Sequence, residues 1–263
     1  MARIYTLVNQ KGGVGKTTSA INLGAYLGYY GQRVLLVDID PQSNATSCLG
    51  VDKMTVKSSS YETLIGTAQV STQILHNPRL KISLLPASPA LAGAEVELVS
   101  VARRETRLKE ALAPVADRYD YILIDCPPSL GILTLNGLIA AKDGVIIPVQ
   151  CEYLALEGLS QLTQTLTRVR SALFSGLTTR GVILTMYDGR TRLAGDVVHE
   201  VRRVFPNQVF QTVIPRSVRL AEAPSYGLPI SIYAPESSAA KAYASLAYEV
   251  LKTDGVQIPV LQE

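Results

Sequence analysis

The feature that most constrains this chain is a glycine-rich turn near its N-terminus. The turn, Lys11–Thr18, has the sequence Lys-Gly-Gly-Val-Gly-Lys-Thr-Thr and lies between an apolar run over 3–8 and a helical pattern over 16–30. A glycine-rich turn between a strand and a helix presents backbone N–H groups, and the positive end of the helix dipole adds to their attraction for anions. The sequence therefore predicts a phosphate-binding loop in an α/β fold.

Two side chains of this turn have expected parts in phosphate binding. Lys16 would reach the β- and γ-phosphates of a nucleotide, and the hydroxyl of Thr17 would ligate Mg²⁺. One position departs from the usual pattern G-x-x-x-x-G-K-[ST], because Gln10 stands where the first glycine is expected. We expect the nucleotide to contact the whole turn: Lys11, Gly12, Gly13, Val14, Gly15, Lys16, Thr17 and Thr18.

The rest of the chain alternates short apolar runs with helical stretches. Such alternation implies right-handed crossovers, so it predicts an α/β fold with a doubly wound, mostly parallel sheet of about eight strands and helices on both faces. The predicted strands are 3–8, 33–37, 82–85, 121–124, 145–149, 181–186, 209–214 and 230–232, and the helical patterns are 16–30, 91–118, 155–174, 193–204 and 237–252.

Nothing in the sequence divides the chain into two units. The 263 residues contain no Pro/Ser-rich linker and no repeat, so we expect a single domain over 1–263 with a loose tail over 253–263. Residues 50–80 are less regular and are expected to form a surface connection.

Composition excludes several classes of protein. Three cysteines cannot form a disulfide framework, which favours a reducing cytoplasm. No run approaches the ~18 uninterrupted apolar residues of a membrane-spanning helix. The N-terminus turns polar too soon for a secretory signal.

Acidic residues follow two of the predicted strands. Asp38 and Asp40 follow the run over 33–37, and Asp125 follows the run over 121–124. Because ligands of doubly wound sheets bind at the carboxyl ends of the strands, these carboxylates should share an edge with the phosphate loop. Asp125 would hold Mg²⁺ through a water molecule. Helix capping or turn formation is the alternative for each carboxylate.

The positive charge of the chain is unevenly distributed. The net charge is +3, but residues 165–220 contain nine arginines and three acidic residues, a local charge of +6. The planar guanidinium fork suits phosphate groups. The same pattern is also typical of a solvated face of ordinary helices.

The glycine-rich turn resembles a known loop. K-G-G-x-G-K-T-T is similar to the deviant Walker A loop of the class of P-loop ATPases that includes ParA, MinD and the nitrogenase iron protein. The resemblance implies that Lys11 reaches the nucleotide of a second subunit in an ATP-sandwich dimer, where a cation stabilises the transferred phosphoryl group. It assigns Asp40 to positioning the attacking water, and it leaves Asp38 either near the metal or as structural support.

Longer stretches narrow the resemblance to chromosomal ParA, also called Soj. They extend from about 3 to 252 and include Asp-Ile-Asp-Pro-Gln-Ser-Asn-Ala-Thr over 38–46 and Ile-Pro-Arg-Ser-Val-Arg-Leu-Ala-Glu-Ala-Pro over 214–224. The resemblance implies a Mg²⁺-dependent DNA-segregation ATPase at the nucleoid. ATP would drive homodimerisation, the dimer would bind double-stranded DNA without sequence preference, and a ParB-type centromere-binding protein would stimulate hydrolysis and release.

The same resemblance extends to residues of the second half of the chain. It implies DNA contacts at Arg190 and Arg219, both of which lie inside the basic segment 165–220. Contacts of this kind give affinity that depends on salt and not on base sequence. Three further residues resemble those near the adenine: Met186, Pro215 and Arg216.

Four other functions are alternatives to this one. A membrane-positioning ATPase of the MinD type would need a terminal amphipathic helix with a basic face, and the last residues carry a single lysine among acidic residues. An iron–sulfur carrier would need paired cysteines, whereas Cys48, Cys126 and Cys151 are scattered. A capsule-export tyrosine kinase would carry a terminal tyrosine cluster. A nucleotide-switched DNA-binding regulator with little ATPase activity is the last alternative, although the loop begins too early to leave room for a preceding helix-turn-helix domain.

Overall fold

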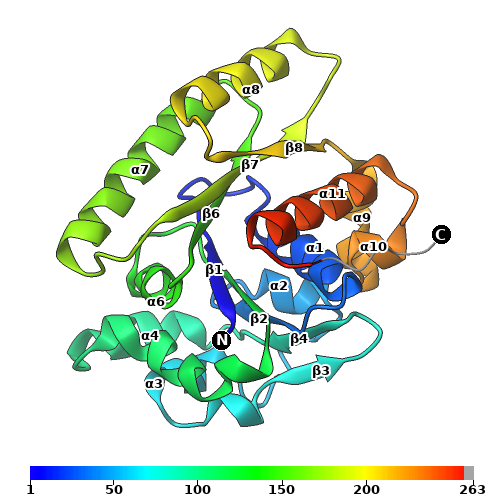
Figure 1. Ribbon diagram of the computed structural model, residues 1–263. Coiled ribbons are helices and arrows are strands. Elements are labelled where there is room, and N and C mark those ends of the chain that lie inside the picture. The colour runs from blue at the N-terminus through cyan, green and yellow to red at the C-terminus, as the bar shows by residue number, and fades with distance from the viewer. Residues whose placement is uncertain (258–263) are drawn as a thin grey trace.

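A single eight-stranded sheet forms the centre of the computed structural model, which describes residues 1–257 (Figure 1). The strand order is β3-β4-β2-β5-β1-β6-β7-β8, and every neighbouring pair is parallel except β3 with β4. The predicted α/β class and the mostly parallel sheet are therefore confirmed. The strands are β1 (Arg3–Leu7), β2 (Val34–Asp38), β3 (Leu75–Asn77), β4 (Ile82–Leu85), β5 (Tyr121–Asp125), β6 (Gly144–Gln150), β7 (Thr179–Tyr187) and β8 (Val209–Pro215).

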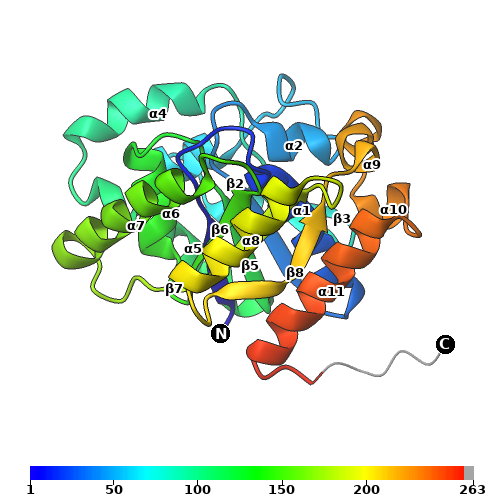
Figure 2. The ribbon, with the colours of Figure 1, turned by 90° about the horizontal axis from the view of Figure 1, so that it is seen from above.

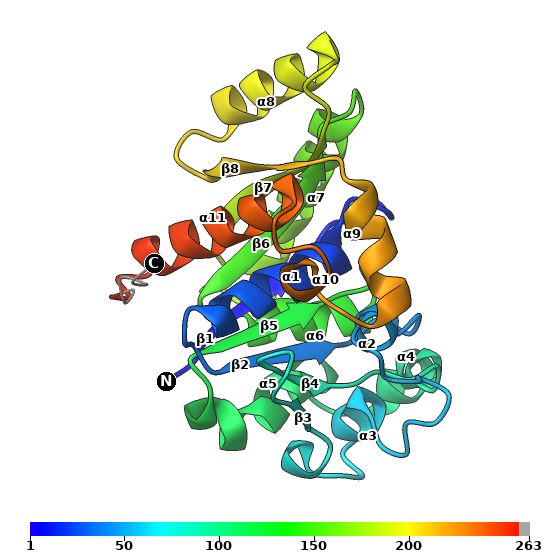
Figure 3. The same cartoon turned by 90° about the vertical axis from the view of Figure 1, so that its right-hand side faces the viewer.

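Helices cover both faces of the sheet. One face packs against α1, α2, α10 and α11, and the other packs against α3 to α8 (Figure 2). Figure 3 views the first face, with α1, α10 and α11 in front of the strands. The helices are α1 (Lys16–Tyr29), α2 (Asn44–Cys48), α3 (Ser60–Ile65), α4 (Leu91–Glu97), α5 (Arg107–Leu112), α6 (Ile132–Ala140), α7 (Ala155–Ala172), α8 (Arg192–Val204), α9 (Val218–Glu222), α10 (Ile230–Tyr233) and α11 (Ser238–Thr253).

The alternation of side chains along the strands explains why both faces are covered. In β5, Tyr121 and Leu123 belong to the core beneath α1, whereas Ile122 and Ile124 belong to the core on the opposite face. Successive side chains of a strand point to opposite faces, so a strand that is apolar throughout must be buried on both. All five residues of β5 are buried.

Seven of the eight predicted strands are present, and the sheet takes its remaining strand from a segment for which no strand was predicted. The prediction for 230–232 is wrong, because these residues form α10, which begins directly after Pro229. The eighth strand is β3, whose three residues are all exposed, so no apolar run marked it.

The helical predictions need three corrections. The pattern over 91–118 is divided into α4, α5 and short 3₁₀ turns, and α6 had no prediction. The expected surface connection over 50–80 contains α3, whose first residue, Ser60, is buried. A capping box in which the Ser59 and Glu62 side chains satisfy free backbone N–H groups starts that helix.

The chain is anchored where the loose tail over 253–263 was expected to begin. Thr253 is the last residue of α11, and the Asp254 carboxylate accepts hydrogen bonds from the hydroxyls of Tyr5 and Tyr121 at 2.9 Å. Arg180 donates to the same carboxylate, also at 2.9 Å. These contacts hold the end of α11 against the sheet. The remaining tail residues, 258–263, lie outside the described residues.

Among residues 1–257, no helix combines the length and the hydropathy that are needed to cross a bilayer.

Replacing Gly137 by alanine should destabilise the fold, because α6 lies against the strands at this glycine. A Cβ there would lie 2.6 Å from the Cys126 sulfur and 3.2 Å from Ile39 Cδ1. Overpacking of this kind costs about 1–3 kcal/mol. We expect Gly137→Ala to lower the urea midpoint of unfolding. The control Gly158→Ala, in α7 with nothing within 4 Å of the new Cβ, should raise it. Equal midpoints for the two variants would contradict this account of the packing.

Candidate nucleotide site

The phosphate loop occupies the end of β1 and the start of α1. Gly13 and Gly15 have φ angles of 74° and 89°, left-handed values that an L side chain rarely adopts. A Cβ at Gly12 or Gly13 would meet nothing within 4 Å, so the space beside this backbone is open. The loop therefore leaves room for an anion against exposed backbone and the first turn of α1.

Three hydrogen bonds fix the loop to the sheet and to α7. The Thr185 hydroxyl donates to the Val14 carbonyl at 2.8 Å, and the Asn9 amide donates to the Pro148 carbonyl at 2.7 Å. The Gln10 amide donates to the Thr165 hydroxyl at 3.1 Å. The residue that departs from the usual loop pattern thus ties the turn to α7.

Lys16 lies inside the loop. Its residue is 7% exposed, and its ammonium donates to the Lys11 carbonyl at 3.2 Å. Burial lowers the pKa of this ammonium, and the nearby carboxylates of Asp125 and Asp40 oppose that shift. A buried cation beside an open, glycine-lined space is suited to a phosphate group.

The carboxylates of β2 and β5 lie at the same edge as the loop. Asp38 is opposite Asp125 in the register of these strands, and Asp125 is opposite Leu7 of β1. Burial, followed by repulsion from Asp38, raises the pKa of the Asp125 carboxyl well above its usual range. The carboxylates therefore share an edge of the sheet with the phosphate loop, as predicted from their positions after the two strands.

Asp125 and Thr17 fit a magnesium ion. The Thr17 hydroxyl donates to Asp125 Oδ2 at 2.7 Å, while Oδ1 is buried and has no hydrogen-bond partner among the described residues. Over residues 1–257 there is no group of three or more His, Cys, Asp or Glu side chains that could hold a metal ion. Mg²⁺ does not need such a group, because it usually binds one or two carboxylates together with waters and phosphate oxygens. The unpartnered oxygen of Asp125 and the Thr17 hydroxyl are suited to hold a hydrated Mg²⁺.

Asp38 is held differently from Asp125. Its Oδ2 accepts from the Thr46 hydroxyl at 2.7 Å and from the Thr46 N–H at 2.9 Å, and its Oδ1 accepts from the Asp40 N–H at 3.1 Å. Burial raises the pKa of Asp38 to about 6. Because both oxygens already accept hydrogen bonds within the protein, the contacts favour structural support over the predicted place of Asp38 among the metal ligands.

Asp40 is buried close to the loop and to Asp125. It is 5% exposed, and its Oδ1 accepts from the Gln42 N–H at 2.9 Å. Its charge affects the titration of both Lys16 and Asp125, so it lies within their electrostatic reach.

Lys11 has a partner that sequence reasoning missed. Glu152, just after β6, lies 3.7 Å from the Lys11 ammonium and 3.5 Å from the Arg216 guanidinium. Glu152 lies within the resemblance to ParA over about 3 to 252, but that resemblance gave it no role. Glu152 therefore joins two predicted nucleotide residues from distant parts of the chain.

A hollow of ≈ 360 Å³ adjoins the loop at Gly15 and Thr18. The structure brings the three predicted adenine residues together around it. Met186 has a φ of 53°, a left-handed value that is costly for a non-glycine residue and is found mostly at functional sites. Sequence reasoning missed several other lining residues, because they are apolar or small. The lining includes Met186, Pro215, Arg216, Thr185, Ser217, Val218, Leu220 and Tyr243.

The two predicted DNA-binding residues are not part of this hollow. Arg190 follows β7 and Arg219 lies in α9, and their side chains are 86% and 61% exposed. Arg190 pairs with Asp188, and Arg219 pairs with Glu222.

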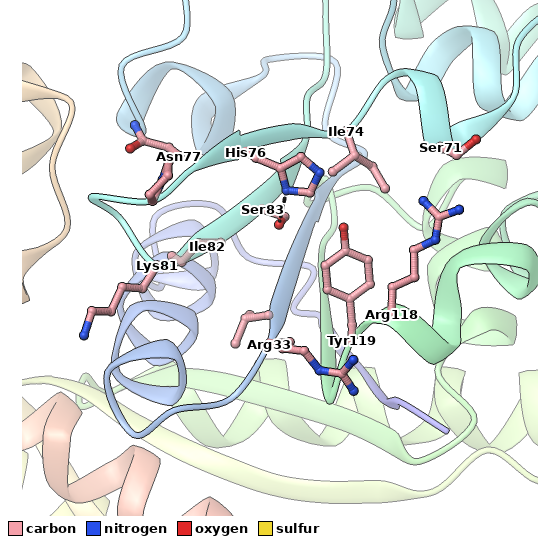
Figure 4. Close-up of a pocket in the computed structure, with 12 residues that line it drawn as sticks. Arg33, Ser71, Ile74, His76, Asn77, Lys81, Ile82, Ser83, Arg118 and Tyr119 are labelled. Atoms are coloured by element: carbon pink, nitrogen blue, oxygen red, sulfur yellow. Dashed lines mark hydrogen bonds between the residues drawn. The ribbon is translucent and has the colours of Figure 1, made fainter.

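A second hollow of ≈ 370 Å³ lies at the opposite ends of the strands, beside β3 and β4. Figure 4 shows that its basic side chains do not converge: the Lys81 ammonium points away from Tyr119, and Arg118 lies toward Ser71. Lys81 is instead placed over the ring of Tyr29, 5.3 Å from its centroid. This hollow contains none of the predicted site residues.

Known proteins match this chain over most of its length. A family model described as an AAA domain matches residues 2–179. The sporulation initiation inhibitor protein Soj of Bacillus subtilis (strain 168) is 54% identical over 250 residues, which cover 95% of this chain and 98% of the relative. The chromosome-partitioning ATPase Soj of Treponema pallidum (strain Nichols) is 54% identical over 256 residues, covering 97% and 99%. A crystal structure of cobyrinic acid a,c-diamide synthase from Mycobacterium smegmatis, with an ATP analogue and magnesium bound, matches with a TM-score of 0.84 at 38% identity over 100% of both chains.

Replacing Thr185 by valine should weaken the attachment of the phosphate loop to β7. The change keeps the shape of the side chain but leaves the Val14 carbonyl without its 2.8 Å donor, which costs about 1–3 kcal/mol when the group is buried. We expect a lower urea midpoint and weaker binding of a fluorescent ADP. The control Thr167→Val, on the exposed side of α7, should change neither. Unaltered ADP affinity in Thr185→Val would show that this bond does not hold the loop.

Proposed function

Because the chain belongs to the Soj/ParA family of chromosome-partitioning ATPases, we propose that it binds and hydrolyses ATP with Mg²⁺ at the loop Lys11–Thr18 and uses the nucleotide to control DNA binding. The observation that carries the proposal is the loop itself, with a buried lysine and an unsatisfied Asp125 oxygen beside it. The diamide synthase is similar at 38% identity, below the 54% of the partitioning relatives, so its named reaction is not carried over.

The residues of the loop would act on the phosphates. The backbone of Gly12–Gly15 would donate hydrogen bonds, and Lys16 would neutralise charge on the β- and γ-phosphates. Thr17 and Asp125 would hold Mg²⁺, which would act as a Lewis acid on the phosphate oxygens. The hollow beside Gly15 would take the base, since its lining combines apolar side chains with Thr185 and Arg216.

Asp40 and Lys11 would complete the reaction. Asp40 would orient the attacking water, because it is buried near Lys16 and retains acceptor capacity beyond its bond from Gln42. Lys11 is exposed at the rim of the loop, so a second copy of the chain could approach it. In the proposed homodimer, Lys11 would leave Glu152 and stabilise the phosphoryl group on the partner.

The proposed partners of the ATP-bound dimer are double-stranded DNA and a ParB-type protein. Arg190 and Arg219 would contact DNA phosphates, and their large exposed fractions support that role. Such contacts are independent of base sequence, so they would place the protein on the nucleoid. Stimulation of hydrolysis by the ParB-type partner would then release the DNA.

Replacing Lys16 by alanine should abolish nucleotide binding, because no other buried ammonium faces the loop among the described residues. Isothermal titration with Mg-ATP measures the effect. Lys57→Ala, which removes an exposed lysine, serves as the control and should bind as the wild type does. Wild-type affinity in Lys16→Ala would refute the placement of the phosphates.

Replacing Asp40 by alanine should separate binding from hydrolysis. We expect ATP affinity to persist while hydrolysis falls by about 10²- to 10⁴-fold, the usual contribution of a group that positions or deprotonates water. An ATP-bound dimer that still binds DNA should then accumulate. Gel filtration with ATP measures this, with Asp117→Ala as an exposed carboxylate control. A purely monomeric Asp40→Ala protein would count against the proposed dimer.

A further inference from the structure

The arginines proposed for DNA contact are already engaged by carboxylates of the same chain. Arg190 Nε donates to Asp188 Oδ1 at 2.9 Å, and one of its terminal nitrogens donates to Asp188 Oδ2 at 2.7 Å. This two-pronged geometry is the one that a guanidinium also uses for phosphate. The Arg190 guanidinium holds the pKa of the Asp188 carboxyl well below its usual range, so the pair stays charged.

The carboxylate that engages Arg219 is itself fixed. A terminal nitrogen of Arg219 donates to Glu222 Oε2 at 2.9 Å, and the Tyr233 hydroxyl donates to the same oxygen at 3.0 Å. Tyr226 stacks on Tyr233 with ring centroids 4.9 Å apart. Glu222 is therefore held in position beside Arg219 by a second element, α10.

Ion pairs neutralise much of the positive charge of the basic segment 165–220. Six of its nine arginines lie within 4.0 Å of a carboxylate, and three of those carboxylates come from outside the segment: Glu152, Glu222 and Asp254. Arg180 is largely buried and pairs with Asp254. The positive field offered to DNA is consequently weaker than the composition of the segment predicts.

We propose that Asp188 and Glu222 are resident counter-anions of the DNA-binding surface, which hold the Arg190 and Arg219 guanidinium groups in place and must be displaced by DNA phosphates. This inference rests on the proposed function and concerns the regulation of its DNA contacts. Because a guanidinium fork cannot serve a carboxylate and a phosphate equally well at once, each binding event exchanges one anion for another. The exchange lowers affinity and favours release once the dimer separates.

Two conservative variants test the proposal. Asp188→Asn and Glu222→Gln remove the negative charge and keep an oxygen that can accept the present hydrogen bonds, including the one from the Arg190 backbone N–H to Asp188. The measurement is the dissociation constant of the full chain with ATP for a duplex of arbitrary sequence, over a series of salt concentrations. Since exposed ion pairs contribute modestly, each variant should bind about two- to fivefold more tightly. Each should also steepen the slope of log K against log salt by up to about one unit.

The control and a double variant separate displacement from a general charge effect. Glu110→Gln removes the charge of a carboxylate that pairs with Arg103, and it should leave DNA affinity unchanged. In an Arg190→Ala background, Asp188→Asn should lose most of its effect, because no guanidinium remains to be released. An undiminished effect there would show that Asp188 acts only as a surface charge and would overturn the proposal.

The failure of this inference can be told apart from failure of the proposed function. If the wild type binds DNA with ATP but Asp188→Asn and Glu222→Gln bind equally or more weakly, the two carboxylates are structural and the proposal of displacement is wrong. If the wild type with ATP binds no DNA at any salt concentration, both the proposed function and this inference are wrong.

Discussion

The attachment of the phosphate loop to β7 is the constraint on which the rest of the structure depends. Left-handed glycines at positions 13 and 15 shape the turn, and the bond from the Thr185 hydroxyl to the Val14 carbonyl fixes it against β7. A loop held in this way presents its backbone N–H groups without further ordering, so phosphate binding does not have to supply that conformational entropy. The same bond brings the loop next to β7, whose Met186 lines the hollow proposed for the base.

Much of the site could be predicted, because parallel strands present their carboxyl ends at one edge. Asp38 and Asp125 are opposite each other in the sheet, next to the end of β1, as the two acid-terminated runs indicated. Met186 is the second-last residue of β7 and Pro215 is the last residue of the neighbouring β8, so residues far apart in sequence line one hollow. The placement of the carboxylates needed only the order of elements and the rule that ligands bind at that edge, whereas Met186 and Pro215 were predicted from the resemblance to ParA.

Other features depended on contacts that no local pattern reveals. The run over 230–232 alternates as a strand does, yet it forms a helix whose Ile230 is buried in the core beneath α1. The Asp38 carboxylate has its hydrogen-bonding capacity taken up mainly by Thr46. Lys11 pairs with Glu152, which is more than a hundred residues away in the sequence. A count of charges in a segment gave the local charge of +6 correctly, but it could not show that three of these arginines pair with carboxylates from outside the segment.

The buried charge of Asp254 has a consequence for how the protein is made. Arg180 lies inside the sheet region with Tyr5 and Tyr121 nearby, and its compensating carboxylate is almost the last described part of the chain. A buried guanidinium without its counter-charge is strongly destabilising. During synthesis, Arg180 in β7 therefore lacks its counter-charge until residues about seventy positions later have left the ribosome, so this part of the sheet is completed only after α11 and Asp254 have been made.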